Sequence, residues 1–463
     1  MSPRPAPALP HGLTRELVAH ALALAHGDAL PANVARDVFR IGRHSLLDWF
    51  AVACAAWQEP PVQILLAEIQ EEGATPCATL LDGSRGSAVQ AALVNGTASH
   101  VLDFDDAHLQ SRVHPSVPLW PAILAQAESG QRSGKCSGRE ALAAFAAGVE
   151  FQSRVASLMG EDHYRLGWHN TATLGALGAT VAVAALLRLD TERTAHAVAV
   201  ACTQAGGMRA LFGTMGKPLH AGQAAAVGLR AARLAARGFT AVPDILEREQ
   251  GFASLYAGKW EPDRVWHDAS VPRVHGIVYK YHASCYGTQA PIEACLQLRQ
   301  DHAFSSDEIR TVEITVEAQY LDVCCIANPS TPSEAKFSVA HMAALALLGR
   351  STVDAGSFTT ALDDPALAAL RRRIVVRAEA AMPRANARAE VTLAHGGTYA
   401  SHSDASRAKT DLARQEVRIA SKARSLLTPV LGSDRAEALI GTVLACDALD
   451  DVTACFSPCL APV

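Results

Sequence analysis

The sequence predicts a mainly α-helical protein with a large all-helical domain and a smaller α+β lid domain. Through most of the first 250 residues, apolar residues recur at i, i+3 and i+4, the period of amphipathic helices. After about residue 268 the pattern changes to alternating, strand-like segments between helices. Helical periodicity returns near residue 408. We therefore assign 1–267 to the helical domain, 268–407 to the lid domain, and 408–463 to helices that rejoin the first domain.

Caps and breakers divide the helical pattern into separate elements. Asp190 with Thr191 opens one helix, and Gly238 closes another. Helices are expected at 13–26, 33–57, 62–72, 86–103, 117–129, 138–158, 171–187, 191–205, 218–237 and 242–248 in the first domain. The lid domain is expected to hold strands at 309–316, 374–378, 389–393 and 399–402, a turn at 395–398, and helices at 287–300, 334–348 and 364–372.

The composition is that of a globular protein, with 49% hydrophobic and 19% charged residues in a chain of 463. The chain has 41 basic and 46 acidic residues, for a net charge of −5. Its densest basic cluster, Arg371 to Arg373, leads into an expected strand. Nucleic acid binding would require a broader basic face, so no nucleic acid partner is expected.

The cysteines and the apolar segments indicate in which cellular compartment the protein is expected. The eleven cysteines are odd in number and irregularly spaced, which argues against a disulfide framework. The most apolar helix, at 171–187, is short for a membrane span. The N-terminal sequence MSPRPAPALPHG has no apolar signal core. We expect a cytoplasmic protein without a membrane partner.

The first chemistry-bearing segment is HVLDFDDAHLQSRVHPS, which begins at His100. His100 and Asp103 are expected on one helical face, with residue 107 one turn further on. Asp103, Asp105 and Asp106 lie within four residues, and carboxylates this close repel one another, so some of their pKa values should be raised. The segment is either an acid–base site or a capped helix end with solvated acids.

The second segment, GWHNTAT, places His169 immediately before the most apolar helix, with Asn170 or Thr171 as the expected cap. A helix N-terminus favours anions and a neutral imidazole, the form that a general base needs. The alternative is a structural histidine.

The third segment, FGTMGKPLHAG at 212–222, holds Lys217 at the start of a helix, since Pro218 suits the first helical position. This is a second anion site or a simple inter-helix turn. It is not a Walker A loop, because Leu211 and Pro218 stand where that motif needs Gly and Ser or Thr.

The fourth segment, YKYHASCYGT at 279–288, brings Lys280 and Cys285 together at the start of the lid domain. Cys285 is either reactive or a buried cysteine. Taken together, the four segments suit a substrate with two or three carboxylates. Removing a proton next to a carboxylate needs a base and cations that stabilise the intermediate. Lys217 and Lys280 could supply the charge, and Asp103, His114 or His169 the proton transfer.

These segments, in this order, resemble the MmgE/PrpD family, and the resemblance covers residues from about 12 to 455. The matching stretches are DFDD…HPS at 103–116, GWHNTATLGALGA at 167–179, GTMGKPLHAGQAA at 213–225, KYHASCYGTQAPIEA at 280–294 and PSEAKFSVAHMAAL at 332–345. Members of the family include 2-methylcitrate dehydratases, cis-aconitate decarboxylases and iminodisuccinate epimerases. The resemblance implies a homodimer, a site between the two domains, and no metal or organic cofactor.

By its motifs, the resemblance implies a site that holds Asp103, position 107, His114, His169, Lys217, Lys280 and position 285. We expect catalytic roles for Asp103, His114, His169, Lys217 and Cys285, and substrate binding by His108, Ser116, Thr214, His220 and Lys280. Decarboxylase-like members have Thr where this chain has Ala107, and a catalytic His where it has Cys285. Ala107 cannot hydrogen-bond to substrate, and a thiol is a poorer proton shuttle near neutral pH. Gln289 also replaces a frequent His of the fourth motif.

Several functions stay open at this point. The first is a dehydratase, and the second an epimerase that returns the proton to the opposite face. A decarboxylase acting on cis-aconitate is a third. The run from Asp103 to Asp106 also matches the DxDD motif of class II terpene cyclases, although 5% aromatic residues offer little to stabilise carbocations. A non-catalytic helical relative, or a divalent ion held by the three aspartates with His108, are further alternatives.

Overall fold

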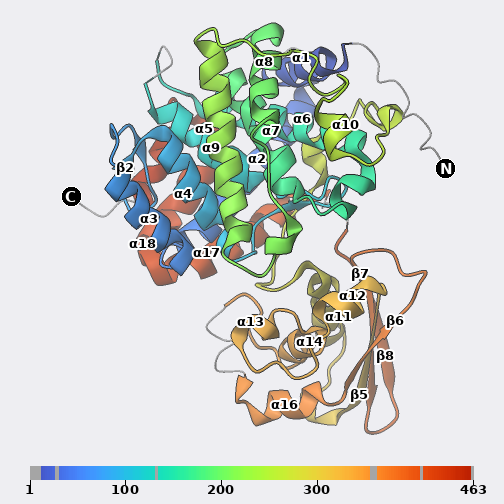
Figure 1. The fold of residues 1–463 in the computed structure, drawn as a ribbon. Helices are drawn as coiled ribbons and strands as arrows, with labels where there is room; N and C mark the ends of the chain where they lie inside the picture. The colour runs from blue at the N-terminus through green and yellow to red at the C-terminus, as the bar shows by residue number, and fades with distance from the viewer. Residues whose placement is uncertain (1–11, 27–30, 131–133, 355–361, 407–409, 460–463) are drawn as a thin grey trace, which may run out of the picture. The chain divides into compact units, whose positions relative to one another are not determined.

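The computed structural model describes residues 12–26, 31–130, 134–354, 362–406 and 410–459. The chain divides into two compact units (Figure 1). Unit 1 comprises Met1–Ile277 and Thr410–Val463, and unit 2 comprises Val278–Lys409. Helices dominate, and the strands form only small sheets. The predicted fold class, mainly α with a smaller α+β domain, is confirmed.

Unit 1 is a helical bundle with a few very short strands. Its α-helices are α1 (Leu13–Ala25), α2 (Ala32–Ala55), α3 (Pro60–Glu72), α4 (Ala88–Val101), α5 (Ser116–Glu128), α6 (Gly138–Arg165), α7 (Asn170–Leu186), α8 (Thr191–Cys202), α9 (Gly216–Ala236), α10 (Phe252–Tyr256), α17 (Leu412–Leu431) and α18 (Ser433–Leu444). The two-residue strands β1 (Ala78–Thr79) and β2 (Arg85–Gly86) pair antiparallel. β3 (Ala107–His108) follows α4, and β4 (Ile277–Val278) lies where the chain passes from unit 1 to unit 2.

The core of unit 1 is centred on α7. Every residue of α7 is buried, and the helix packs against α6, α9, α5 and α8. Small residues permit this close packing: at the contact of α4 with α9, a Cβ added to Gly96 would lie 2.8 Å from Cα of Gly222. No helix among the described residues has both the length and the apolar character needed to cross a membrane.

The helix starts follow the capping chemistry in the sequence. Ser87 and Ser137 form capping boxes with Gln90 and Glu140 at the starts of α4 and α6. The Asp190 carboxylate caps α8 as expected, accepting a hydrogen bond from the backbone N–H of Arg193. These caps satisfy backbone groups that a helix start leaves unpaired.

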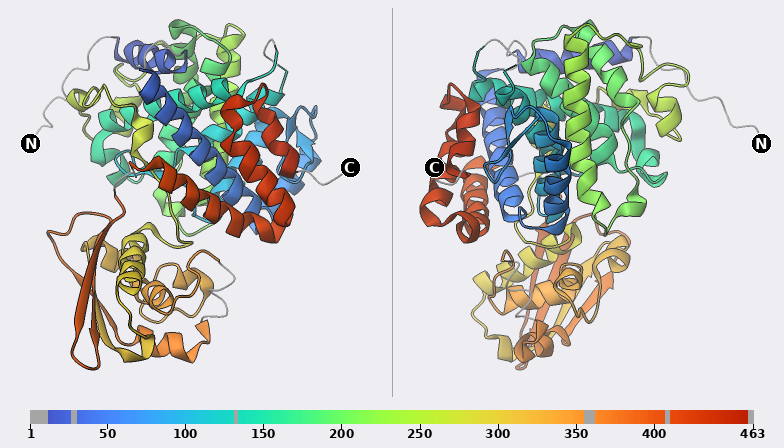
Figure 2. Two further views of the ribbon diagram at one scale, coloured as in Figure 1. Left: turned by 180° about the vertical axis from the view of Figure 1, so that it is seen from behind. Right: turned by 60° about the vertical axis from the view of Figure 1, so that its left-hand side comes forward.

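The C-terminal helices return to unit 1. α17 and α18 pack against α2, so segments almost 400 residues apart in sequence lie side by side (Figure 2). The Asp411 carboxylate caps the start of α17, and Gly432, with φ of 78°, ends it. This return buries Lys422 of α17 beside Asp48 of α2.

Unit 2 combines one sheet with several helices. The sheet has the order β6-β5-β7-β8, with β5 parallel to β6 and antiparallel to β7, which is antiparallel to β8. Its elements are α11 (Tyr286–Asp301), β5 (Ile309–Val316), α12 (Gln319–Cys324), α13 (Pro332–Ala335), α14 (Val339–Leu347), α16 (Pro365–Arg371), β6 (Ile374–Ala378), β7 (Asn386–Leu393) and β8 (Thr398–Asp404). Valine and isoleucine of β5 alternate toward the buried side, as the sequence pattern predicts.

Two predicted helices are wrong. Residues 242–248 form turns, because a segment this short, with Pro243 inside it, gains too little to nucleate a helix. The helix expected at 334–348 is broken into α13 and α14. Ser338 is the N-cap of α14, and its side chain accepts a hydrogen bond from the backbone N–H of His341.

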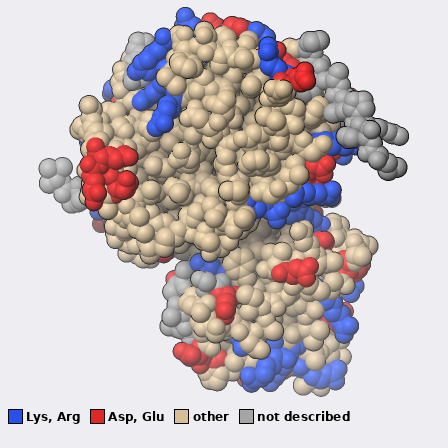
Figure 3. Space-filling view, viewed as in Figure 1, with Lys and Arg blue, Asp and Glu red and all other residues tan. Residues whose placement is uncertain are grey.

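The face of unit 1 in Figure 3 carries its Lys, Arg, Asp and Glu side chains in small groups near its edges. The middle of this face is a broad expanse of other residue types. This face therefore has no continuous basic surface of the kind that binds a nucleic acid backbone.

Candidate active site

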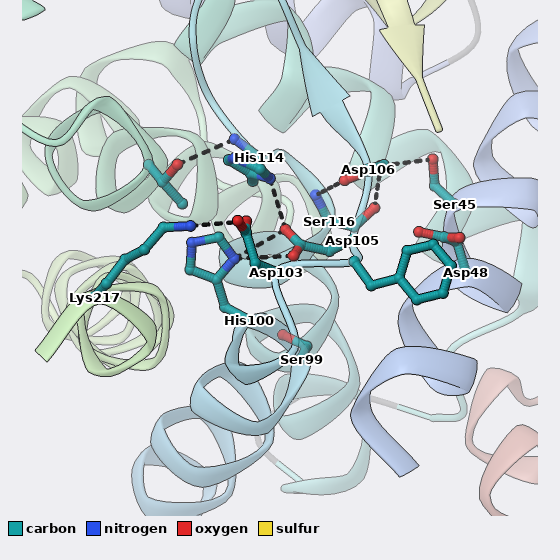
Figure 4. A network of polar contacts seen from close by, with 12 residues as sticks. Ser45, Asp48, Ser99, His100, Asp103, Asp105, Asp106, His114, Ser116 and Lys217 are labelled. Atoms are coloured by element: carbon teal, nitrogen blue, oxygen red, sulfur yellow. Dashed lines mark hydrogen bonds and ion pairs between the residues drawn. The ribbon is translucent and has the colours of Figure 1, made fainter. Parts of the chain in front are cut away.

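The candidate site of unit 1 is built where α4 ends. α4 ends at Val101, and Asp103 has a left-handed φ of 51°. The expectation that His100, Asp103 and residue 107 share one helical face is therefore wrong, since Ala107 lies in β3. The turn at Asp103 folds the acidic run back toward the end of α4, so that Asp105 meets His100 (Figure 4).

Asp105 lies between two imidazoles. Its carboxylate oxygens are each 3.0 Å from Nδ1 of His100, and Oδ2 is 2.8 Å from Nδ1 of His114. The side chains of Asp105 and His100 are fully buried, whereas that of His114 is 19% exposed. Burial by itself opposes ionisation, but His100 and His114 hold the pKa of Asp105 well below its usual range. Asp105 is therefore a buried carboxylate.

His100 is neutral in this environment. Burial lowers its pKa to about 4, an effect that outweighs the attraction of Asp105. The backbone N–H of His114 donates to Oγ1 of Thr171 at 3.1 Å, which ties the loop to the start of α7. The imidazole rings of His100 and His114 lie edge to face, with centroids 4.8 Å apart.

Asp106 points the other way, into the core. Its carboxyl group accepts from the backbone N–H of Ser116 at 3.1 Å, and it contacts Oγ of Ser116 at 2.6 Å and Oγ of Ser45 at 3.2 Å. Burial, with a further contribution from Asp48, raises the pKa of Asp106 to about 8. Asp106 is thus protonated at neutral pH. The expected rise in pKa holds for this aspartate and fails for Asp105, because burial and the partners matter more than crowding.

A buried ion pair of Lys422 with Asp48 contacts the loop after α4 at Phe104. Nζ of Lys422 lies 2.6 Å from Oδ1 of Asp48 and 2.5 Å from the backbone oxygen of Phe104. The ammonium also lies 3.9 Å from the centroid of the Phe104 ring. Burial raises the pKa of Asp48 to about 6, although Lys422 acts in the opposite direction. The C-terminal helix α17 thereby fixes the backbone that carries Asp103 and Asp105.

Lys217 supplies the positive charge of the cluster. Its Nζ lies 2.8 Å from Oδ1 of Asp103, and it lies 5.6 Å from the centroid of the Phe212 ring. The side chains of Lys217 and Asp103 are 17% and 36% exposed, so solvent or a ligand can reach the pair. An ammonium at the first turn of α9 is placed to bind a carboxylate.

His169 and His220 form the far side of the cluster. His169, and not Asn170 or Thr171 as expected, is the N-cap of α7, and it makes no side-chain cap bond. Its ring stacks on that of His100 at 5.9 Å, and its Nδ1 lies 3.2 Å from Nδ1 of His220. Burial, followed by the nearby His100 and Lys217, lowers the pKa of His169 well below its usual range. His169 is therefore neutral, mainly through burial.

Three other residues expected to bind substrate are engaged in contacts within unit 1. Both ring nitrogens of buried His108 are used: Nε2 lies 3.1 Å from the oxygen of Arg273, and Nδ1 lies 2.8 Å from Oγ of Ser111. Ser116 is buried and holds Asp106. Thr214 is exposed, and its Oγ1 donates to the oxygen of Leu211 at 2.7 Å, within the turn before α9.

Lys280 and Cys285 belong to unit 2. Lys280 is buried, and Cys285 is half-buried at the N-cap of α11. The backbone N–H of Cys285 donates to the oxygen of Lys336 at 2.9 Å. The hydrogen bond with Cys285, together with burial, raises the pKa of the Cys324 thiol well above its usual range. Cys285 thus has a thiol neighbour that the sequence does not reveal.

Four residues of the cluster have the types of donor atom that a divalent ion binds. Donor atoms of His100, Asp103, Asp105 and His114 lie within 4.8 Å of one another. The ammonium of Lys217 already binds Asp103, and Nδ1 of both rings faces Asp105. An ion would have to displace these contacts. The absence of a metal cofactor stays a prediction.

His100, Asp48 and Lys422 belong to the site but have no predicted role, and the sequence does not distinguish Asp105 from Asp106. The sequence does contain one usable signal, a histidine five residues before Asp105 at the end of an apolar helix. The partnership of Asp48 with Lys422 spans 374 residues and leaves no local pattern.

Comparison with known proteins places the chain in a class. The model of the MmgE/PrpD N-terminal domain matches residues 21–265, and that of the MmgE/PrpD C-terminal domain matches residues 282–448. The chain belongs to the MmgE/PrpD family.

Among its relatives are proteins named as cis-aconitate decarboxylases. The chain is 30% identical over 306 residues to the cis-aconitate decarboxylase-like protein oryM of Aspergillus oryzae, covering 62% of this chain and 63% of that protein. It is 38% identical over 168 residues to cis-aconitate decarboxylase of Homo sapiens, covering 36% and 35% of the two chains. With the Mus musculus enzyme of the same name, identity is 26% over 377 residues, covering 78% and 76%. The matched segments thus cover less than two thirds of the length of the first two relatives.

Proposed function

We propose that the protein is a lyase of the MmgE/PrpD type that acts on a small di- or tricarboxylate without a cofactor. The observation that carries the proposal is the adjacency of the Asp105–His114 pair and the Lys217–Asp103 pair. The first pair offers an oriented imidazole, and the second offers an ammonium for a carboxylate. Proton removal next to a carboxylate requires both.

In the proposed reaction, an imidazole of the cluster takes the proton from the carbon next to a substrate carboxylate. Lys217 stabilises the negative charge that develops on that carboxylate. The electron pair of the C–H bond forms the C=C bond, the C–O bond to the β-hydroxyl breaks, and the hydroxyl leaves as water with a proton returned by the protonated imidazole. His114 is the best-placed base among the histidines of unit 1, because it is oriented by Asp105 and partly exposed.

We favour dehydration over the decarboxylation named for the relatives. Ala107 is buried in β3 and offers only a methyl group where decarboxylase-like members have Thr. Cys285 stands where they have a catalytic His. The roles of Lys280 and Cys285, a homodimer and a cytoplasmic location stay proposals that rest on the resemblance.

An epimerase of an iminodisuccinate-like dicarboxylate is the second candidate. It needs two acid–base groups, and the rings of His114 and His169 both lie next to the ring of His100.

The test is proton NMR of the purified protein in D₂O with 2-methylcitrate, citrate, cis-aconitate and iminodisuccinate. A dehydratase gives new olefinic signals from a hydroxy acid. An epimerase gives deuterium at a carbon that keeps its substituents, and a decarboxylase gives loss of one carboxyl group from cis-aconitate. The variant His114→Gln serves as the negative control, and activity retained in it would contradict the assigned base.

A further inference from the structure

The Asp105 carboxylate contacts two histidines, and in each of them the contacting atom is Nδ1. His100 Nδ1 lies 3.0 Å from both of its oxygens, and His114 Nδ1 lies 2.8 Å from Oδ2 (Figure 4). The His100 contact has hydrogen-bond geometry, whereas the His114 contact is a close approach of nitrogen to oxygen without hydrogen-bond geometry. A single buried carboxylate thus faces Nδ1 of both rings.

An ionised carboxylate can only accept hydrogen bonds. The two histidines hold Asp105 in that form. Each facing Nδ1 must therefore carry the proton, since a bare nitrogen would set a lone pair against a negative oxygen. A neutral imidazole has only one N–H, so the lone pair is then on Nε2.

Nε2 of His100 is buried and has no hydrogen-bond partner in the described structure. In Figure 4 it lies on the opposite side of the ring from Asp105, toward the side of Lys217. A buried acceptor without a protein partner can be satisfied by a bound water or by a ligand, or it can have a catalytic role. The contact through Nδ1 keeps this acceptor aimed away from Asp105 and toward the Lys217 side of the cluster.

We propose that Asp105 is a positioning residue that fixes both His100 and His114 as Nδ1-protonated tautomers, so that each presents the lone pair of Nε2. The kinetic part of this inference rests on the proposed function. In that reaction His114 meets substrate through Nε2, and Asp105 acts only through the histidines. A carboxylate that orients a histidine by its Nδ1–H is known to be worth large factors in rate.

The first measurement needs no substrate. Long-range ¹H–¹⁵N spectra of the full chain labelled with ¹⁵N-histidine distinguish protonated from bare ring nitrogens. His100→Gln and His114→Gln identify the two sets of signals. We expect both rings to show a protonated Nδ1 and a bare Nε2. A protonated Nε2 with a bare Nδ1 in either ring of the wild-type protein would overturn the proposal.

The second measurement uses Asp105→Asn. The amide has one acceptor oxygen and one donor nitrogen, so its NH₂ group must face a lone pair on one of the rings. We expect one ring to change to the Nε2–H tautomer, with kcat reduced roughly 100-fold or more and KM changed less than about 3-fold. Unchanged tautomers in this variant contradict the inference.

Asp106→Asn is the matched control. Asp106 is the neighbouring buried carboxyl, is protonated at neutral pH, and faces Ser45 and Ser116 instead of the histidines. We expect its tautomers and kcat to equal those of the wild-type protein. Equal losses in both variants would show a merely structural effect. If the wild-type protein turns over none of the panel, the proposed function fails while the tautomer measurement still decides the role of Asp105.

Discussion

Oδ1 of Asp103 lies 2.8 Å from Nζ of Lys217, which joins the loop after α4 to the first turn of α9. Asp103 holds the ammonium in place but also competes for it. A substrate carboxylate that binds Lys217 must share the cation with Asp103 or displace it. The pair therefore sets both the position and the availability of the positive charge.

Replacing Lys217 by Met should weaken substrate binding. The variant keeps the length of the side chain and removes the charge, and a hydrogen bond to a charged group is worth about 1.5–3 kcal/mol. We expect kcat/KM to fall roughly 10- to 100-fold in steady-state kinetics with the substrate identified by NMR. Lys259→Met, at an exposed lysine of unit 1, is the control. A variant at position 217 that matches this control would remove Lys217 from the site.

Breaking the buried ion pair between Lys422 and Asp48 should destabilise unit 1. Lys422→Met leaves the fully buried Asp48 carboxylate without its cation, which costs about 3–5 kcal/mol. The double variant Asp48→Asn with Lys422→Met removes both charges, so it should recover most of that loss. Urea unfolding gives both free energies. Additive losses in the double variant would show that the two residues act independently.

Asp106 should make stability depend on pH in an unusual direction. Its pKa is about 8 in the folded state and near 3.9 in the unfolded chain, so unfolding releases a proton between these values. Stability attributable to Asp106 therefore falls as pH rises from about 4 to 8, by up to ~1.4 kcal/mol per pH unit.

Asp106→Asn removes this dependence while keeping the shape of the group. From urea unfolding at pH 6, 7 and 8, we expect a shallower decline in the variant than in the wild-type protein. The interval above pH 6 is chosen because Asp48, with a pKa of about 6, contributes mainly below it. Parallel curves would mean that Asp106 is ionised in the folded state.

The close approach of α4 and α9 offers a structural test. A Cβ at Gly222 would lie 2.1 Å from the oxygen of Leu93 and 2.3 Å from Oγ1 of Thr97. Gly222→Ala must therefore push apart α9, which carries Lys217, and α4, which leads into the loop that bears Asp103, at a cost of about 1–3 kcal/mol or more. We expect a lower melting temperature and a raised KM.

Gly441→Ala is the matched helix variant, because an added Cβ there has no atom within 4 Å. Alanine is the better helix former, so this change should raise stability by about 0.5–1 kcal/mol. Equal effects at Gly222 and Gly441 would contradict the packing argument.

The helices of unit 1 could be predicted from the sequence because their burial follows a regular period. The helix expected at 171–187 is α7 at Asn170–Leu186, and the strand expected at 309–316 is β5. The segment at 242–248 has apolar residues at helical spacing but lacks the length to form a helix. Ser338 divides the expected helix at 334–348 because its side chain offers a cap that periodicity does not register.

The cluster at the end of α4 was only partly predictable. The motifs contain Asp103, His114, His169 and Lys217, and the structure brings these four together around His100. The opposite protonation of Asp105 and Asp106 could not be predicted, since neighbouring residues of the same type differ only in what surrounds them. The burial of His108 and the exposure of Thr214 likewise depend on tertiary packing.

The return of α17 to α2 has a consequence for how the protein is made. A ribosome produces Asp48 long before Lys422, and all of unit 2 emerges between them. Until α17 arrives, the nascent chain has an aspartate on α2 without its cation, and Phe104 without the ammonium that anchors its backbone. The loop bearing Asp103 and Asp105 therefore gains this support only after Lys422 has been made, so chains that stop before Lys422 would lack it.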